Sequence, residues 1–377
     1  MGEGLRSARK ARGWSQERLI REIERYAERH LIDVATTASL RVYVSEWENG
    51  KRPLSERYAA LLRPLLGITD AELRPSAAPS GQPPTTDGYD DLLDRIDASR
   101  SVSQSMVKTF MDQTELLRTV DRQMGAAGLV DQMSGHLAAL EDALTFAVLP
   151  DARRPVALAL AGAATLAAWQ ALHAGAIDRA WRHYELGKRA ALDADAPMYV
   201  AHAMGEQAYV LCDAGRPHLA VDLIHEAQRV AGDRVSPRLR AWLYAAEAEL
   251  YAQVGQADAC HQALERAAAS IPAGPEPRDP DMLSIFLNDG HLTRWRGNAL
   301  ALLGDADAVT NLYAALDVMD PSFTRAQSGL RCDLAQAHLA RGEYDQAKDQ
   351  LRQARLLANR TGSVRHRRRI DLLTARL

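Results

Sequence analysis

The chain has 377 residues, of which 47% are apolar and 25% charged, a composition typical of a globular protein with more than one domain. Its three cysteines are too few and too widely spaced to hold a secreted scaffold together by disulfides, so we expect a reducing, cytoplasmic setting. Cys212, Cys260 and Cys332 are expected to be small core residues. We find no secretory leader, and we interpret the longest apolar stretch, residues 156–173, as a buried helix, so no membrane partner is expected.

The charges are divided unevenly along the chain. Residues 1–75 carry 14 Lys and Arg against 11 Asp and Glu, whereas the remainder is acidic and the whole chain has a net charge of −3. This division predicts a small basic head on an acidic body. Residues 75–88 contain four prolines and no apolar residue larger than alanine, which predicts a flexible linker. We therefore place the first domain at residues 1–74.

Two motifs follow one another in the head, WSQERL at residues 14–19 and VSEWENGKRP at residues 44–53. Together they resemble the helix-turn-helix of XRE-family, phage-repressor-like regulators. The resemblance implies that the head binds a double-stranded DNA operator. Ser15 is expected to cap a second helix that extends to about His30, and a loop over residues 31–36 then leads to the recognition helix.

The recognition helix is expected to end at Gly50, and Leu40, Val44 and Trp47 predict its buried stripe. The opposite face supplies the candidate base-reading side chains, which are Ser39, Arg41, Val42, Ser45 and Glu46. Candidate phosphate contacts lie near the ends of the two helices and are Gln16, Asn49, Lys51 and Arg52. For any one of these residues, the alternative is an ordinary structural or solvated position.

A capping box at residues 69–72 predicts a short helix that ends the head. After the linker the apolar residues recur at helical spacing and no strand pattern is found, so the predicted fold class is all-α. Residues 89–150 are expected to form connecting helices. Their apolar spacing fits either a dimer seam or a helix packed on its own domain.

Five glycines, each between two helical patterns, mark an internal repeat with a period near 40: Gly175, Gly215, Gly255, Gly304 and Gly342. Five positions after each glycine lies a small or medium apolar residue, and nine positions after it lies a larger one. This is expected where antiparallel helices cross and stack. The pattern resembles the tetratricopeptide repeat (TPR) and implies a solenoid of about five helix pairs over residues 151–362. Residues 363–377 are expected to form a capping helix whose arginines, Arg365, Arg367, Arg368 and Arg369, face solvent on its outer side.

The first helix of each pair in such a solenoid lines the concave face. Counting back from each glycine gives the candidate ligand groove, which consists of Trp169, His173, His202, Glu206, Tyr209, Asp213, Trp242, Glu249, Gln253, His291, Arg294, Trp295, Asn298, Asp333 and Gln336. Mixed aromatic and polar side chains suit a peptide or a small organic ligand, and Asn298 is a candidate clamp for a peptide backbone. The groove carboxylates favour a basic or neutral ligand unless Arg294 and the histidines offset them. The alternative is a groove that is merely solvated or contacts another protomer.

A repressor-like head on a TPR-like body resembles the RRNPP-type peptide-sensing regulators of quorum sensing and other helix-turn-helix/TPR regulators. The resemblance implies a homodimer whose ligand changes dimer arrangement and operator affinity, and hence transcription. The alternative is a TPR scaffold that binds a partner protein while the head anchors it to DNA. Nucleotide-binding, metalloprotease and paired-cysteine motifs are missing, so we expect neither an enzyme nor a cofactor or metal site.

Overall fold

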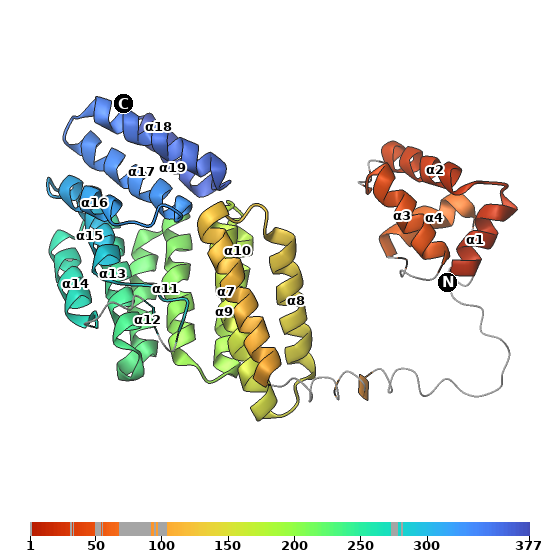
Figure 1. The fold of residues 1–377 in the computed structure, drawn as a ribbon, viewed down its shortest axis with the longest axis horizontal. Helices are drawn as coiled ribbons and strands as arrows, with labels where there is room; N and C mark the ends of the chain where they lie inside the picture. The colour runs from red at the N-terminus through yellow and green to blue at the C-terminus, as the bar shows by residue number, and fades with distance from the viewer. Residues whose placement is uncertain are drawn as a thin grey trace. The chain divides into compact units, whose positions relative to one another are not determined.

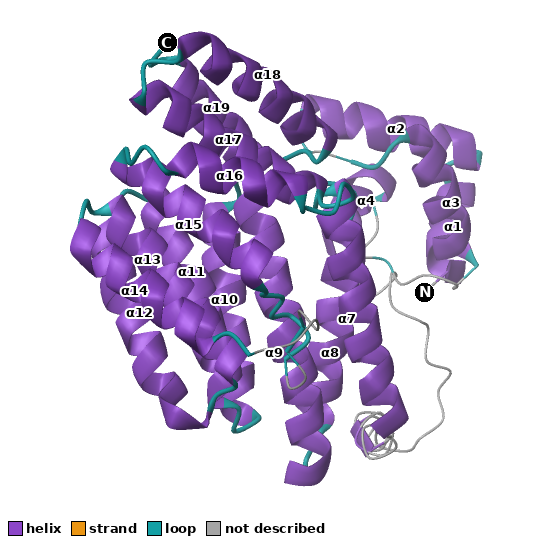
Figure 2. Cartoon of the chain, turned by 60° about the vertical axis from the view of Figure 1, so that its left-hand side comes forward, coloured by secondary structure: helices purple, strands orange, loops and turns teal. Residues whose placement is uncertain are grey.

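The computed structural model describes residues 2–30, 32, 34–49, 54, 56–67, 92–93, 96, 104–272, 278–279 and 282–377. Every regular element within these ranges is helical, and a single bridge between Arg278 and Phe286 is the sole extended pairing there (Figures 1 and 2). The predicted all-α fold class is therefore confirmed. The chain forms two compact units, Met1–Thr86 and Asp87–Leu377.

The N-terminal unit contains α1 (Gly2–Ala11), α2 (Gln16–Arg29), α3 (Thr37–Glu48) and α4 (Glu56–Leu66). Ser15 caps α2, as predicted, because its hydroxyl accepts a hydrogen bond from the Arg18 backbone nitrogen at 3.1 Å. Thr36 caps α3, and the stripe of Leu40, Val44 and Trp47 is buried as predicted. The predicted capping box at 69–72 and the predicted linker at 75–88 lie outside the described residues.

A buried ion pair, which we did not predict, ties α1 to the end of α3. The Arg9 guanidinium donates to both carboxylate oxygens of Glu48, at 2.5 and 2.8 Å, and both side chains are almost inaccessible. Arg9 also donates to the carbonyl of Trp14, and Gln16 donates to Glu48 at 2.8 Å. Burial acts to raise the pKa of Glu48, but the hydrogen bonds from Arg9 and Gln16 outweigh it and hold the pKa below its ordinary value. Glu48 is therefore a structural anchor for α1, α2 and α3.

We expect Glu48→Gln to destabilise the N-terminal unit by about 3–5 kcal/mol, because it leaves the buried Arg9 charge without its counterion. Hydrogen exchange of the full-length chain measures this as lost protection in α1–α3. Glu17→Gln is the matched control, since Glu17 pairs with Arg41 at the surface and such pairs contribute less than about 1 kcal/mol. Equal protection in the two variants would show that Glu48 does not anchor the unit.

The C-terminal unit is a solenoid of five antiparallel helix pairs. The pairs are α9 (Pro150–His173) with α10 (Ile177–Asp193), α11 (Pro197–Asp213) with α12 (Pro217–Ala231), α13 (Pro237–Gln253) with α14 (Ala257–Ser270), α15 (Asp289–Leu303) with α16 (Ala308–Asp317), and α17 (Thr324–Ala340) with α18 (Tyr344–Arg360). A single 3₁₀ turn, η1 (Gly232–Arg234), follows α12. The helices of each pair pack against one another and against the next pair, which confirms the predicted TPR-like architecture.

The five predicted turn glycines all adopt left-handed conformations, with φ between 71° and 76°. A residue with a Cβ atom would be strained at such an angle, which explains why glycine ends the first helix of each pair. The buried positions predicted after each glycine are confirmed in four pairs and displaced by one residue in the fourth. There Ala308, Leu312 and Ala315 are buried, and Tyr313 is 37% exposed. The reason is that α16 begins four residues after Gly304, whereas the other second helices begin two residues after their glycine.

Helix α9 is long and apolar enough to span a membrane by length and composition alone, but 78% of its apolar window is buried within the C-terminal unit. It packs mainly against α10, with α7, α8 and α11 also in contact. The interpretation of residues 156–173 as a buried helix is thus confirmed.

The two ends of the solenoid meet. Helix α7 (Gln104–Met124) packs on both α9 and α17, and α8 (Val130–Phe146) packs on α9 (Figure 1). The last helix, α19 (Val364–Thr374), packs on α17, α18 and α9. Gly125 lies so close to the end of α18 that an added Cβ atom would fall 2.0 Å from the Thr361 carbonyl oxygen. The first and last pairs therefore close into a ring around the concave face.

Many of the regularly spaced apolar residues noted in the sequence lie on α7 and pack against the C-terminal unit itself. Phe110, Leu117 and Val120 lie against the main core, which favours the alternative of a helix packed on its own domain. Met106 and Met124 remain 49% and 68% exposed.

Candidate functional site

The predicted base-reading residues lie on α3, on the face opposite its buried stripe. Arg41 and Val42 are exposed, and Ser39, Ser45 and Glu46 are half-buried beside them. Ser39 lies in the first turn, where its backbone nitrogen donates to the Thr36 hydroxyl. In helix-turn-helix proteins this N-terminal part of the second helix approaches the base edges.

Arg41 is held by Glu17 of α2. Its guanidinium donates to the two carboxylate oxygens at 2.8 and 3.3 Å, and both side chains are more than half exposed. An exposed pair of this kind is weak, so it does not prevent Arg41 from turning to another partner.

The predicted phosphate contacts divide into two groups. Gln16 and Asn49 make hydrogen bonds within the unit, Gln16 to Glu48 and Asn49 to the carbonyl of Ser45 at 2.8 Å. Arg6 of α1 also donates to Asn49, and we did not predict a role for it. Lys51 and Arg52 lie outside the described residues.

The second candidate site is a cavity of about 660 Å³ inside the solenoid, a volume typical of small-molecule sites. The structure brings together all fifteen predicted groove residues in its lining, from the first helices of the five pairs. Sequence spacing predicted these positions because each first helix turns the same face inward.

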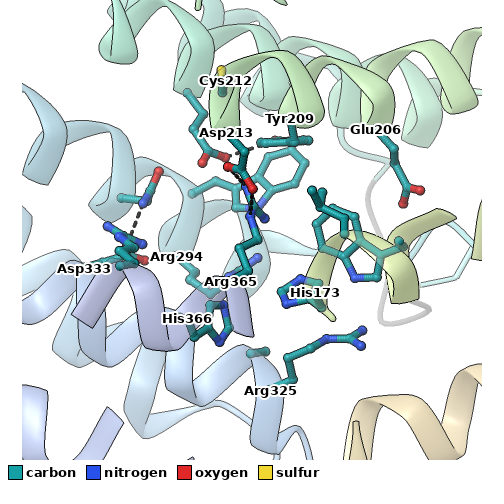
Figure 3. A pocket seen from close by; sticks show the side chains of 18 of the residues that line it. His173, Glu206, Tyr209, Cys212, Asp213, Arg294, Arg325, Asp333, Arg365 and His366 are labelled. Atoms are coloured by element: carbon teal, nitrogen blue, oxygen red, sulfur yellow. Dashed lines mark hydrogen bonds and ion pairs between the residues drawn. The ribbon is translucent and has the colours of Figure 1, made fainter. Parts of the chain in front are cut away.

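The interpretation of the last arginine cluster as an outer, solvated face was wrong for Arg365 and Arg369. Arg365 of α19 points to Asp213 of α11, and its two hydrogen bonds measure 2.7 and 3.0 Å (Figure 3). Arg369 pairs with Asp333 of α17 at 2.6 Å, and Arg368 also lines the cavity. Helix α19 folds across the concave face because it neutralises two carboxylates that would otherwise be enclosed without counterions.

Several candidate ligand groups are already engaged within the chain. Tyr209 donates to Glu249 at 3.0 Å, and Asn298 donates to Asp333 at 2.7 Å. The Asn298 side-chain oxygen, which is buried, has no hydrogen-bond partner among the described residues. The Asn298 amide therefore offers a ligand an acceptor more readily than a donor.

Helix α11 also carries a histidine and a carboxyl group in an unusual ionisation state. His202 and Glu206 lie one turn apart, 3.5 Å from each other, and both side chains are largely shielded from solvent. Burial raises the pKa of Glu206 to about 7, although Arg118 acts in the opposite direction. Burial lowers the pKa of His202 to about 3, and Arg118 reinforces this shift. At neutral pH His202 is therefore uncharged and Glu206 is about half protonated.

Besides α19, two other parts of the lining were not predicted. Helix α7 contributes Arg118, Asp121 and Arg122, and the segment before α15 contributes Ser284 and Phe286. Neither belongs to the repeat, so no periodic signal placed them at the concave face.

Cys212 was expected to be a core residue, but it is half-buried and lines the cavity. Burial raises the pKa of its thiol to about 12, so the sulfur is not an activated nucleophile. Cys260 and Cys332 are buried as expected. Among the described residues, no group of three or more His, Cys, Asp or Glu side chains is placed to hold a metal ion.

We expect Arg365→Gln to weaken the docking of α19 by about 1.5–3 kcal/mol, since it removes a bidentate hydrogen bond to the Asp213 carboxylate. Hydrogen exchange should increase in α19 and leave α12–α14 unchanged. Arg367→Gln, on the same helix but outside the cavity lining, is the control. Unaltered exchange of α19 in Arg365→Gln would contradict a closing role for this pair.

Glu206 also predicts a pH dependence. In the folded chain this carboxyl keeps its proton up to about pH 7, whereas an exposed glutamate loses it near 4.5. The unfolded chain therefore binds fewer protons in this interval, and stability falls as the pH rises. We expect the wild type to lose stability relative to Glu206→Gln between about pH 5 and 7.5 in urea unfolding.

The comparison with Glu206→Gln cancels the opposing contribution of the buried histidines, which both proteins share. Glu265→Gln on the exposed side of α14 is the control and should follow the wild-type profile. Parallel profiles for wild type and Glu206→Gln would show that this carboxyl is ionised in the folded chain.

Comparisons with known proteins do not assign this chain to a family. No family profile matches it, and no curated protein does. Among solved structures, two chains described as TPR-like repeats of a putative kinesin light chain from Podosopora anserina, one of them a single-substitution variant, are 17% identical to it. They cover 53% and 52% of this chain and 94% of their own length, with TM-scores of 0.34 and 0.33.

Proposed function

We propose that the protein is a cytoplasmic, sequence-specific DNA-binding transcriptional regulator that acts as a homodimer. Its C-terminal unit senses a peptide or a small molecule, as in RRNPP-type regulators. The observation that carries the proposal is the presence in one chain of two separate devices. One is the α3 face with Arg41 and Val42 exposed beside a buried stripe, and the other is a cavity lined by the concave face of a helical repeat.

DNA recognition is supported by the way α3 is held. The Arg9–Glu48 pair and the buried stripe fix the inner face of the helix, while the opposite face carries side chains able to read bases. An arginine in this position can donate two hydrogen bonds to a guanine edge, and Val42 can contact a thymine methyl group. The Glu17 carboxylate that now holds Arg41 occupies the place of that acceptor.

A ligand in the cavity can influence the head through α7. This helix follows the segment that joins the two units in sequence, and it supplies three residues to the cavity lining. A ligand that contacts α7 and α19 together favours the closed ring over more open arrangements. We propose that this shift changes the arrangement of the dimer and, through it, the affinity for the operator.

A scaffold that binds a partner protein is the second candidate function, because helical repeats commonly use a concave surface for this purpose. The closing helices favour a small ligand, since α7 and α19 contribute to the lining and narrow the access to it. Native mass spectrometry of the purified chain distinguishes the two functions by the mass of what is retained. The same measurement reports whether the chain is a dimer.

We expect Arg41→Ala to lose about 1–3 kcal/mol of discrimination at a single base pair of the operator. Selection of bound sequences from genomic DNA followed by gel shifts on point-substituted sites measures this. Arg52→Ala, at a predicted phosphate contact, should weaken all sites alike and reduce the salt dependence.

Arg182→Ala is the control, because Arg182 is exposed on α10 and pairs with Asp178. If selection enriched no sequence, the regulator proposal would fail. If Arg41→Ala and Arg52→Ala altered every site equally, Arg41 would not read a base.

A further inference from the structure

The cavity lining is rich in positive charge. It contains seven arginines and five carboxylates, the reverse of the balance expected from the four groove carboxylates in the sequence. Three carboxylates, Asp121, Asp213 and Asp333, already pair with arginines. A fourth, Glu206, is about half protonated at neutral pH because burial raises its pKa to about 7. The lining therefore has more cations than it can neutralise.

Arg118 pairs with Glu115 outside the lining, so the lining arginines without an ion pair in the described ranges are Arg122, Arg294 and the exposed Arg368. Of these, Arg122 and Arg294 are half-buried. Arg122 lies over the rings of Phe286 and Phe323, at 5.5 and 5.8 Å from their centres. Within the described part of the chain, neither arginine makes an ion pair or a hydrogen bond. Burial lowers the pKa of Arg122 to about 10, and the nearby Arg118 reinforces this. The guanidinium remains charged at neutral pH and is half-buried; Glu115 acts on it at longer range, but no carboxylate in the described ranges forms an ion pair with it.

His291 connects the two arginines. It precedes Arg294 by three residues on α15, about one helical turn. Burial lowers its pKa to about 4, and Arg294 and Arg122 reinforce this shift. Its ring also lies edge-on to Phe286, with the centres 4.6 Å apart. Arg122, Arg294 and Phe286 thus surround one neutral histidine in the cavity wall.

Unpaired polar atoms in the same cavity point to a missing partner. His173 Nε2, His366 Nδ1 and Asn298 Oδ1 have no hydrogen-bond partner in the described ranges, although each residue is more than nine-tenths buried. Figure 3 shows His173 and His366 beside Arg365 and Arg325. Buried polar groups of this kind are normally satisfied by a ligand or by water.

An aromatic wall lies next to these groups. Trp242 packs edge-on against His202 and against Trp295, with ring centres 5.0 and 5.6 Å apart, and all three line the cavity. Trp295 directly follows Arg294 in α15. A ligand bound at Arg294 therefore meets an apolar surface on one side.

We propose that the cavity binds an organic carboxylate with an aromatic or other apolar body. The carboxylate lies between Arg122 and Arg294, and the body packs on Trp242 and Trp295. The carboxylate belongs either to a free small acid or to the C-terminus of a short peptide. This inference names the ligand class for the sensing cavity and so rests on that part of the proposed function.

The test uses full-length protein and fluorine NMR of 3-(4-fluorophenyl)propanoate, with its amide and the corresponding amine as matched probes. We expect protein-dependent line broadening for the carboxylate at millimolar concentration and at least fivefold weaker binding of the amide and amine. Binding of the amide or amine as strong as that of the carboxylate overturns the proposal. Absence of broadening for all three probes does so as well.

Arg122→Gln should weaken binding of the carboxylate at least fivefold, because it removes the unpaired cation while keeping most of the side chain. Arg182→Gln on α10, which lies outside the cavity, should bind as the wild type does. If Arg122→Gln fails to fold, as judged by its thermal unfolding, Arg294→Gln replaces it with the same expectation. Unchanged binding in the folded variant overturns the assignment of the carboxylate to this position.

A tripeptide, Ala-Ala-Phe, distinguishes the two sources of the carboxylate. Displacement of the fluorinated probe by the free acid but not by the peptide amide supports a peptide C-terminus. Displacement by small aromatic acids alone supports a free organic acid. No DNA is present in these measurements, so a failure of DNA recognition leaves their outcome unaffected, and a failure here leaves the operator selection unaffected.

Discussion

The C-terminal unit depends on how carboxylates enclosed by a helical ring are neutralised. Asp213 and Asp333 project from first helices of the solenoid into the cavity, where Asp333 is buried and Asp213 is partly exposed. Enclosing such charges is costly unless a counterion is close and well oriented. Arg365 and Arg369 meet this requirement from α19, so one interaction both neutralises the interior and holds the last helix across it. These pairs hold α19 across the concave face and so form one wall of the cavity.

The same interactions explain which parts of the C-terminal unit were predictable. The five turn glycines, the helix pairs and the inward face of each first helix follow from local spacing, and the structure has them where they were predicted. The fourth pair departs by one residue because its turn is longer, a feature that Gly304 alone does not reveal. The inward position of α19 was not predictable, since Arg365 and Asp213 are 152 residues apart and no pattern links them. The contribution of α7 to the cavity lining was not predictable for a similar reason, because α7 lies outside the repeat.

In the N-terminal unit, the apolar pattern was informative and the polar pattern was ambiguous. Leu40, Val44 and Trp47 identify the inner face of α3 from their spacing alone. Glu48 was considered only as part of a helix stop, although it is the buried partner of Arg9. A glutamate near a helix end is usually solvated, and only the position of α1 shows that this one is not. Gln16 illustrates the same ambiguity, since a residue expected to face phosphate also supports Glu48.

Ring closure has a kinetic consequence. Ser363, the residue before α19, contacts His173 of α9, which is 190 residues away. Arg365 of α19 contacts Asp213 of α11, which is 152 residues away. These contacts can form only after the intervening pairs have stacked. Docking of α19 is then a late folding event, and its undocking is a smaller reverse step than unfolding of the stacked pairs. Under the proposed sensing function, a ligand that entered while α19 was undocked would be held when the helix returned. Its residence time would then depend on the opening rate of one short helix, so that the duration of a signal would not follow from affinity alone.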